Sequence, residues 1–168
     1  MPRSFDMAAE YHGTVEQIHR AFGDERYWLD RLEQSGADET TLDSIASGAD
    51  GGIDVITTLT LRADKLPGVV AQFHRGDLSF VREEVWTPVR DGQATAQVKG
   101  SIPGAPATLA GSAALSPAGA GARLEFRAIV EVRIPLVGGK VENFVGSQLV
   151  GLLTAEQDFT TAWIRDNA

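Results

Sequence analysis

The residues best suited to chemistry are Arg82 and Glu84, which lie two apart in a segment with the alternation of a β-strand. Side chains two apart on a strand point to the same face and lie side by side. A guanidinium offers a planar fork of donors to a carboxylate or phosphate, so this pair is suited to orienting a polar head group. The alternative is that both charges lie at a strand end or a sheet edge and reach water.

Both faces of this strand, expected over residues 77–87, carry charge. Leu78, Phe80 and Trp86 share the face of the charged pair, whereas the opposite face carries Glu83 between two valines. Either face therefore brings at least one charge toward the interior, and alternation alone leaves open which face turns inward. Glu83 and Glu84 point to opposite faces, so they cannot act together as a carboxylate dyad.

Other patterns of catalytic residues are lacking. The three histidines, His12, His19 and His74, do not have the helical i, i+4 spacing of a zinc site and are expected at the surface. The absence of cysteine excludes a disulfide, a thiolate zinc site and a cysteine nucleophile. There is no Gly-x-Ser-x-Gly elbow. We therefore assign no catalytic residue, metal or cofactor, and the balance leans away from an enzyme.

Length and charge limit the class of protein. A chain of 168 residues fits one domain, spanning residues 1–168. The net charge of −8 argues against nucleic acid and against an anionic membrane surface as the main partner. The most apolar stretch, residues 144–153, is too short to span a bilayer. With no secretory signal at residues 1–6 and no cysteine, a cytoplasmic location is expected.

The first third of the chain predicts one strand and two short helices. Residues 4–12 alternate between apolar and polar, as a half-buried strand does. Thr14 and Gln17 have the spacing of a helix capping box, and Asp24 is placed to cap a second helix. Gly36 is expected to end that helix in the C′ position.

The middle of the chain changes to a period of two and predicts further antiparallel strands. Leu42 and Ile45 fall out of phase in the first of them, which indicates a bulge. Residues 63–76 are expected to form a short helical turn or an ordered flap. Turn sequences separate strands near residues 38–48, 53–62, 77–87, 93–102, 106–116 and 122–135.

The last segment predicts one long helix over residues 140–165, about 39 Å in length. Its apolar side chains, from Val141 to Trp163, recur at steps of three, four or seven. Gly146 and Gly151 lie inside this helix, where each costs about 1 kcal/mol relative to alanine. Two explanations stay open: a helix that flexes around a ligand, or a close approach to the sheet.

This order of elements resembles the START-like superfamily, also called birch-pollen-allergen-like or polyketide-cyclase-like, and within it an actinobacterial family of uncharacterised proteins. The resemblance covers the whole chain. It implies the helix-grip fold, an α+β architecture in which a curved seven-stranded antiparallel sheet wraps a long C-terminal helix. It also implies a cavity between sheet and helix. Its most specific piece is the joint Ile134-Pro135-Leu136-Val137-Gly138-Gly139-Lys140-Val141-Glu142.

The resulting hypothesis is that the protein binds or carries a hydrophobic or amphipathic small molecule, such as a lipid, a sterol-like or a polyketide-like compound. One alternative is a cyclase, dehydratase or hydrolase acting on a polyketide-like or lipid substrate in the same cavity. Another is a protein-interaction module whose aromatic side chains fill the core. The residues expected to line the cavity are Met7, Tyr11, Leu59, Phe80, Arg82, Glu84, Trp86, Val98, Leu109, Phe126, Phe144 and Leu152.

Overall fold

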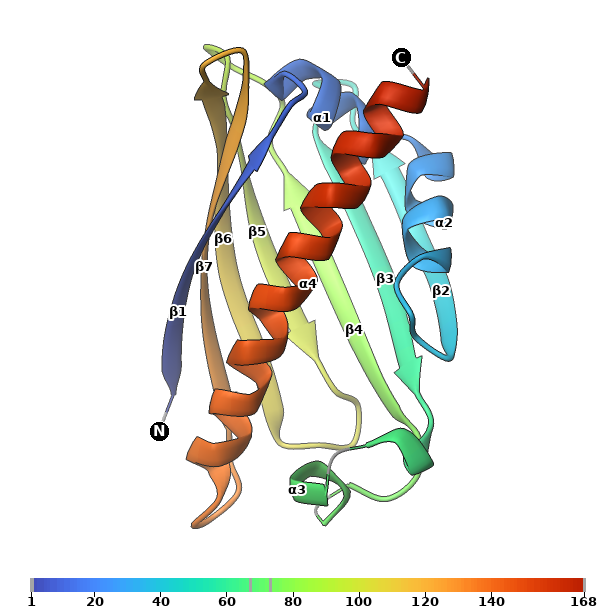
Figure 1. Cartoon of the computed structure of the whole chain (residues 1–168), viewed down its shortest axis with the longest axis vertical. Coiled ribbons are helices and arrows are strands. Elements are labelled where there is room, and N and C mark those ends of the chain that lie inside the picture. Colours follow the sequence, from blue (N-terminus) through green and yellow to red (C-terminus); the bar gives the residue numbers. More distant parts are fainter. Residues whose placement is uncertain (1, 67, 73, 168) are drawn as a thin grey trace.

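Alternating apolar residues build a single antiparallel sheet of seven strands in the computed structural model, which describes residues 2–66, 68–72 and 74–167. The spatial order is β1-β7-β6-β5-β4-β3-β2, so β1 and β2 form the edges (Figure 1). All neighbours pair antiparallel. The strands are β1 (Arg3–Tyr11), β2 (Glu39–Ser47), β3 (Ile53–Leu61), β4 (Leu78–Trp86), β5 (Ala94–Ser101), β6 (Ala107–Ala118) and β7 (Gly121–Val132).

Two short helices, α1 (Val15–Phe22) and α2 (Glu25–Glu33), connect the two edge strands. The predicted capping box is confirmed: the Gln17 N–H donates to Thr14 Oγ1 at 3.2 Å, and the Thr14 N–H donates to Gln17 Oε1 at 2.9 Å. Asp24 caps α2 by accepting from the Arg26 N–H at 2.9 Å. The predicted end of α2 is slightly wrong, because Gln34 is the C-cap and Gly36 turns the chain two residues later, with φ of 81°.

The bulge predicted in β2 is confirmed, since its register against β3 shifts between Leu42 and Ser44. The extra residue, Asp43, brings Leu42 and Ile45 to the same side, and both pack against the core. The segment after β3 holds the predicted helical turns, η1 (Ala63–Lys65) and α3 (Gly68–Ala71). Pro67 and Phe73 of that segment lie outside the described residues.

The joint between β7 and the last helix lies earlier in the chain than predicted. β7 ends at Val132 rather than at residue 135, and α4 (Gly138–Asn167) begins two residues before the expected start. The reason lies in Glu142, whose carboxylate accepts from the Val132 N–H at 2.9 Å and so replaces a continuing strand partner. Leu136 then turns the chain with φ of 71°.

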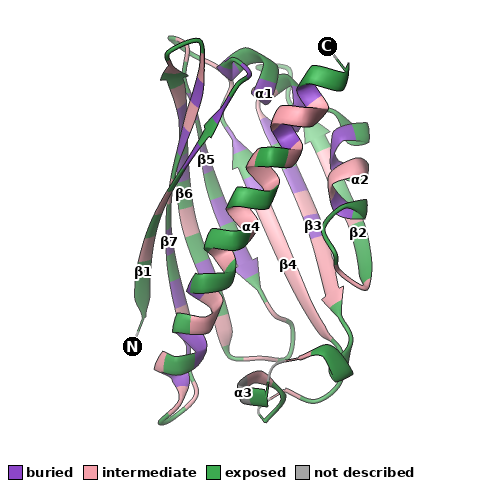
Figure 2. Cartoon of the chain, viewed as in Figure 1, coloured by how far each residue is buried: buried purple, intermediate pink, exposed green. Residues whose placement is uncertain are grey.

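Helix α4 runs diagonally across one face of the sheet, with α1 at one end and α3 at the other (Figure 1). Its backbone packs closely against β1, β7, α1 and α2. Its buried residues lie near its two ends: Val141, Glu142 and Gly146 at one, Thr160 and Ile164 at the other. No residue of α4 between positions 147 and 159 is fully buried (Figure 2). The helix is therefore buried most deeply near its two ends, and between them its inward side chains are partly buried.

The two helix glycines have different surroundings. A methyl group at Gly146 would overlap the ring of Phe5 on β1, so this glycine permits a close approach of helix and sheet. Gly151 has no atom within 4 Å of the position that a Cβ would take. The close-approach explanation is thus confirmed for Gly146 and does not apply to Gly151.

These surroundings predict opposite effects of the same substitution. We expect G146A to lower the free energy of unfolding by about 1–2 kcal/mol, because the overpacking against Phe5 exceeds the gain in helix propensity. G151A is the matched control and should raise it by up to about 1 kcal/mol. Urea denaturation measures both, and equal shifts in the two variants would contradict the close contact at Gly146.

Candidate ligand-binding site

The inward face of β4 carries the charged pair. Glu84 and Trp86 are 6% and 3% exposed and turn toward α4, whereas Val85 between them is 43% exposed on the opposite face. Phe80 and Arg82 lie on the inward face as well, and all four line a hollow beneath the helix. The question that alternation left open is therefore decided: the face with Arg82 and Glu84 points inward.

An apolar groove of about 360 Å³ lies between the sheet and the first half of α4. The turns at η1 and α3 and the loop after α2 border it, so one end of the groove is formed by connecting segments. Gln148 is one of the few polar side chains along it. Its apolar lining includes Leu59, Leu66, Phe80, Leu109, Val130, Val141, Phe144, Val145, Leu149 and Leu152.

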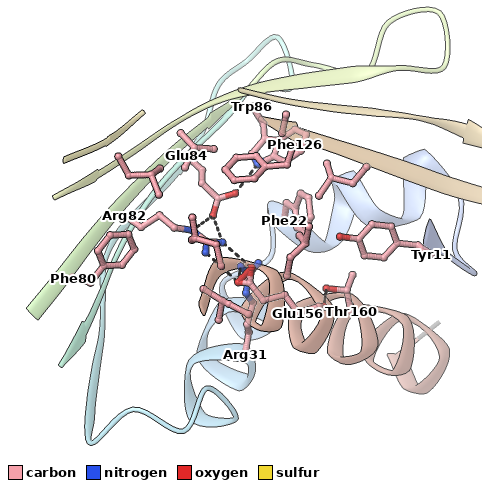
Figure 3. Close-up of a pocket in the computed structure, with 17 residues that line it drawn as sticks. Tyr11, Phe22, Arg31, Phe80, Arg82, Glu84, Trp86, Phe126, Glu156 and Thr160 are labelled. Atoms are coloured by element: carbon pink, nitrogen blue, oxygen red, sulfur yellow. Dashed lines mark hydrogen bonds and ion pairs between the residues drawn. The ribbon is translucent and has the colours of Figure 1, made fainter. Parts of the chain in front are cut away.

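Deeper under the helix, a chamber of about 60 Å³ continues from the groove. The groove and the chamber share Phe80, Leu109, Leu149 and Leu152, which form the boundary between them. Unlike the groove, the chamber combines aromatic walls with charged and hydroxyl groups (Figure 3). A second hollow of about 70 Å³ lies between α2 and α4. It shares the charged residues Arg31, Arg82 and Glu156 with the chamber.

The charged groups form one cluster of two arginines and two glutamates from β4, α2 and α4, namely Arg82, Glu84, Arg31 and Glu156. Arg82 Nη2 lies 2.8 Å from Glu84 Oε2, and Arg82 Nη1 lies 3.1 Å from Glu156 Oε2. Arg31 pairs with the same Glu156 carboxylate. The Trp86 indole N–H donates to Glu84 Oε1 at 3.2 Å. The positive and negative charges balance, so the cluster is neutral as a whole.

Arg31 is fixed by aromatic and hydroxyl contacts on its other side. Its guanidinium lies 4.6 Å from the ring centre of Trp28, a cation–π contact. Its Nη1 donates to the Tyr27 hydroxyl oxygen at 3.2 Å. Tyr27 in turn lies 2.6 Å from Thr160 Oγ1, which donates to the Glu156 carbonyl at 2.7 Å. The hydrogen bonds thus lead from Arg31 through Tyr27 and Thr160 to Glu156. The ion pair between Glu156 and Arg31 completes the ring.

Several ionisable side chains of the chamber have a shifted pKa, and each shift moves the pKa further from 7. Burial opposes ionisation of Glu156, but Arg31 and Arg82 outweigh it and lower the pKa of this carboxyl. Burial opposes the charge on the two arginines too, yet the nearby carboxylates raise the pKa of each guanidinium. Burial also raises the pKa of Tyr11. At neutral pH these groups are therefore held in fixed ionisation states.

The structure brings most of the residues predicted from sequence to these hollows. Leu59 and Phe144 line the groove. Met7 lies in neither hollow and packs with Phe5 against the apolar cluster at the β7 end of the sheet. The residues that line the chamber, several of them shared with the groove, are Tyr11, Phe80, Arg82, Glu84, Trp86, Val98, Leu109, Phe126 and Leu152.

Sequence reasoning missed Arg31 and Glu156, although a signal for both exists. Arg31 follows Tyr27 and Trp28 by four and three residues, so it shares their buried face of α2. Glu156 lies four residues after Leu152 on the inward stripe of α4. A charge in phase with an apolar stripe indicates a buried pair, because an unpaired charge is rarely buried. Choosing which two such charges meet requires the tertiary structure.

The cluster predicts that neutralising Glu156 lowers the free energy of unfolding more than neutralising a carboxylate at the surface. E156Q deprives two largely buried arginines of their shared partner, so we expect the free energy of unfolding to fall by about 2–4 kcal/mol. The control is E131Q, whose partner Arg133 has a side chain that is 76% exposed. It should change stability by less than about 1 kcal/mol. Similar losses in both variants would mean that the cluster is no more stabilising than a surface pair.

The lowered pKa of Glu156 predicts a pH dependence. Its ionised form stabilises the folded chain above the ordinary value of 4.5, and this contribution disappears as the pH falls through the lower folded pKa. E156Q lacks the titrating group. The difference in free energy of unfolding between wild type and E156Q should therefore be constant near neutrality and shrink in acid, as urea denaturation across pH would measure. A difference that grows in acid would contradict a lowered pKa.

Comparison with known proteins agrees with this architecture. Uncharacterized protein Rv0481c of Mycobacterium tuberculosis is 51% identical over 173 residues, covering 99% of this chain and 99% of that protein. This mycobacterial relative agrees with the actinobacterial family expected from the sequence. Among the residues that the structure describes, no helix is both long and apolar enough to cross a membrane.

Solved structures share the fold at low sequence identity. The Zhui aromatase/cyclase from a Streptomyces species superposes with a TM-score of 0.63 at 8% identity, over 98% of this chain and 94% of that one. A START superfamily protein from Mycobacterium smegmatis superposes with a TM-score of 0.54 at 14% identity, over 98% and 99%. Residues 6–164 match the family described as "Protein of unknown function (DUF2505)", and the chain therefore belongs to that family and has the START-like, helix-grip fold.

Proposed function

We propose that this protein binds or carries a hydrophobic or amphipathic small molecule, in the cytoplasm, within the groove between the sheet and α4. The observation that carries the proposal is the apolar groove between the sheet and the first half of α4. It measures about 360 Å³ and is lined mainly by apolar side chains. Ligand pockets are typically of about 300–1,000 Å³, apolar, with a few polar groups at fixed places.

The fixed charges of the chamber favour binding over catalysis. General acid–base catalysis works best with a group whose pKa lies near the working pH. The pKa of Glu156 is lowered, and those of Tyr11, Arg31 and Arg82 are raised. None of the three histidines lines the groove or the chamber in the described part of the chain. Such a site holds a molecule in place more readily than it transfers a proton.

A second candidate is an enzyme of the cyclase, dehydratase or hydrolase type acting on a polyketide-like or lipid substrate in the same cavity. Two observations favour it: the structural likeness to the Zhui aromatase/cyclase, and the polar groups at the end of an apolar groove. The two candidates differ in what happens to a bound molecule. A carrier releases its ligand chemically unchanged, whereas an enzyme converts it and loses turnover in Y11F or R82A while still binding it.

Filling the groove tests the proposal. We expect V145W to reduce binding of the neutral fluorescent probe Nile red at least about tenfold, because the indole would occupy the space between α4 and the sheet. V150W on the same helix is the matched control, since Val150 is 53% exposed and lies outside the groove lining. It should bind the probe as wild type does. Fluorescence titration measures affinity, and circular dichroism checks that each variant is folded.

Native mass spectrometry of the purified wild-type protein provides a second readout. We expect an added mass that solvent extraction releases as an apolar compound, and this mass should be absent from V145W. If wild type binds neither Nile red nor any co-purifying compound, the groove is not a ligand site. The protein-interaction module would then be the better reading.

A further inference from the structure

The side chain of Tyr11 has an unusual position for a hydroxyl group. Tyr11 is the last residue of β1, is only 5% exposed, and directs its hydroxyl into the chamber (Figure 3). Among the described residues that line the chamber, none forms a hydrogen bond with this oxygen, which borders the open space of the chamber (Figure 3). Tyr27, which is fully buried, has its hydroxyl bonded to Thr160 and Arg31.

A hydroxyl that faces a largely apolar hollow without a protein partner gives no hydrogen bond that would favour tyrosine over phenylalanine at this place. The surroundings of Tyr11 would suit phenylalanine, since Phe22, Leu124 and Phe126 line the same chamber. Folding alone therefore does not explain the hydroxyl. Burial raises the pKa of Tyr11, so at neutral pH the group stays protonated and can both donate and accept a hydrogen bond.

The charged cluster limits what this hydroxyl can meet. Arg82 is already bonded to Glu84 and Glu156, and Arg31 is bonded to Glu156 and Tyr27. An anionic head group would compete with carboxylates that already hold the guanidinium groups, and a cation would face two arginines. The cluster as a whole is neutral, so a neutral polar group can enter beside it without breaking an ion pair.

We infer that the chamber recognises a neutral, oxygen-bearing end group, a hydroxyl or a carbonyl, of an amphipathic molecule whose apolar body lies in the outer groove. Tyr11 is the residue that forms a hydrogen bond with that oxygen. The chamber measures about 60 Å³, which suits a small end group and not a bulky head such as a phosphodiester. This inference rests on the proposed function, because it names the chemistry at the inner end of the same site.

Three probes with one apolar body and different ends test the inference: 4-octylphenol, octylbenzene and 4-octylbenzoate. Displacement of Nile red from the wild-type protein at neutral pH gives their relative affinities. We expect 4-octylphenol to bind about three- to tenfold more tightly than octylbenzene, the difference that one neutral hydrogen bond makes. The ionised 4-octylbenzoate should bind most weakly. This ranking needs no variant and so does not depend on whether one folds.

Y11F then assigns the preference to one atom. In Y11F, 4-octylphenol should bind no more tightly than octylbenzene, whereas the affinity for octylbenzene should stay at the wild-type value. Thermal unfolding should show Y11F at least as stable as wild type, since the lost hydroxyl has no protein partner. The control is T154V, which removes a hydroxyl that bonds to the Val150 carbonyl on the exposed side of α4, outside the groove and the chamber, and should keep the preference for the phenol.

The outcomes separate this inference from the proposed function. Tighter binding of 4-octylbenzoate than of 4-octylphenol would overturn the inference, because it would mean that the arginines accept an anion. Equal affinity of wild type for 4-octylphenol and octylbenzene, or an unchanged preference in Y11F, would overturn it as well. In each of these cases the groove would remain a ligand site. If Nile red and all three probes fail to bind wild type, the proposed function itself fails.

Discussion

A single helix laid across a twisted sheet cannot contact it along its whole length, and the rest of this structure depends on that constraint. Helix α4 meets the sheet closely at Gly146, where the missing Cβ admits the ring of Phe5. At the far end, Ile164 packs beside Gly13 and Thr160 bonds to Tyr27. The apolar groove lies beneath the first half of the helix, beside the first anchor. The inward side chains of this half of the helix and the facing strands form its lining.

The first anchor also depends on a buried carboxylate. Glu142 is fully buried and accepts the last N–H of β7, so it fixes the start of α4 against the end of the sheet. Arg3 lies near its other oxygen, at 3.9 Å, a distance too long for a hydrogen bond. This one side chain links the last residue of the strand to the first turns of the helix.

The charged cluster determines the depth and the chemistry of the space. It joins β4, α2 and α4 through Arg82, Arg31 and Glu156, and it forms part of the wall of the chamber. Apolar residues of similar size would give comparable stability, because ion pairs in the interior lose much of their gain to desolvation. What the cluster adds is a polar but neutral wall. This wall distinguishes the chamber from the apolar groove beside it.

The sequence by itself determined the elements and their order. Alternation predicted the strands, the spacing of Leu42 and Ile45 predicted the bulge, and Thr14 with Gln17 predicted the first cap. These features depend on residues close together in the chain, where local periodicity and local hydrogen bonds decide the outcome. The aromatic and charged residues of β4 were found for the same reason, since they share one face of one strand.

Only the tertiary structure decided which face of β4 turns inward and which charges meet there. Alternation treats the two faces of a strand alike, so the choice depends on what packs against the sheet. Arg31 and Glu156 are 125 residues apart, and no periodic pattern relates positions so distant. The position of the Tyr11 hydroxyl, which faces the chamber without a protein partner, likewise depends on segments far apart in the chain. Contacts between distant segments fixed the site, because they alone set what each inward side chain faces.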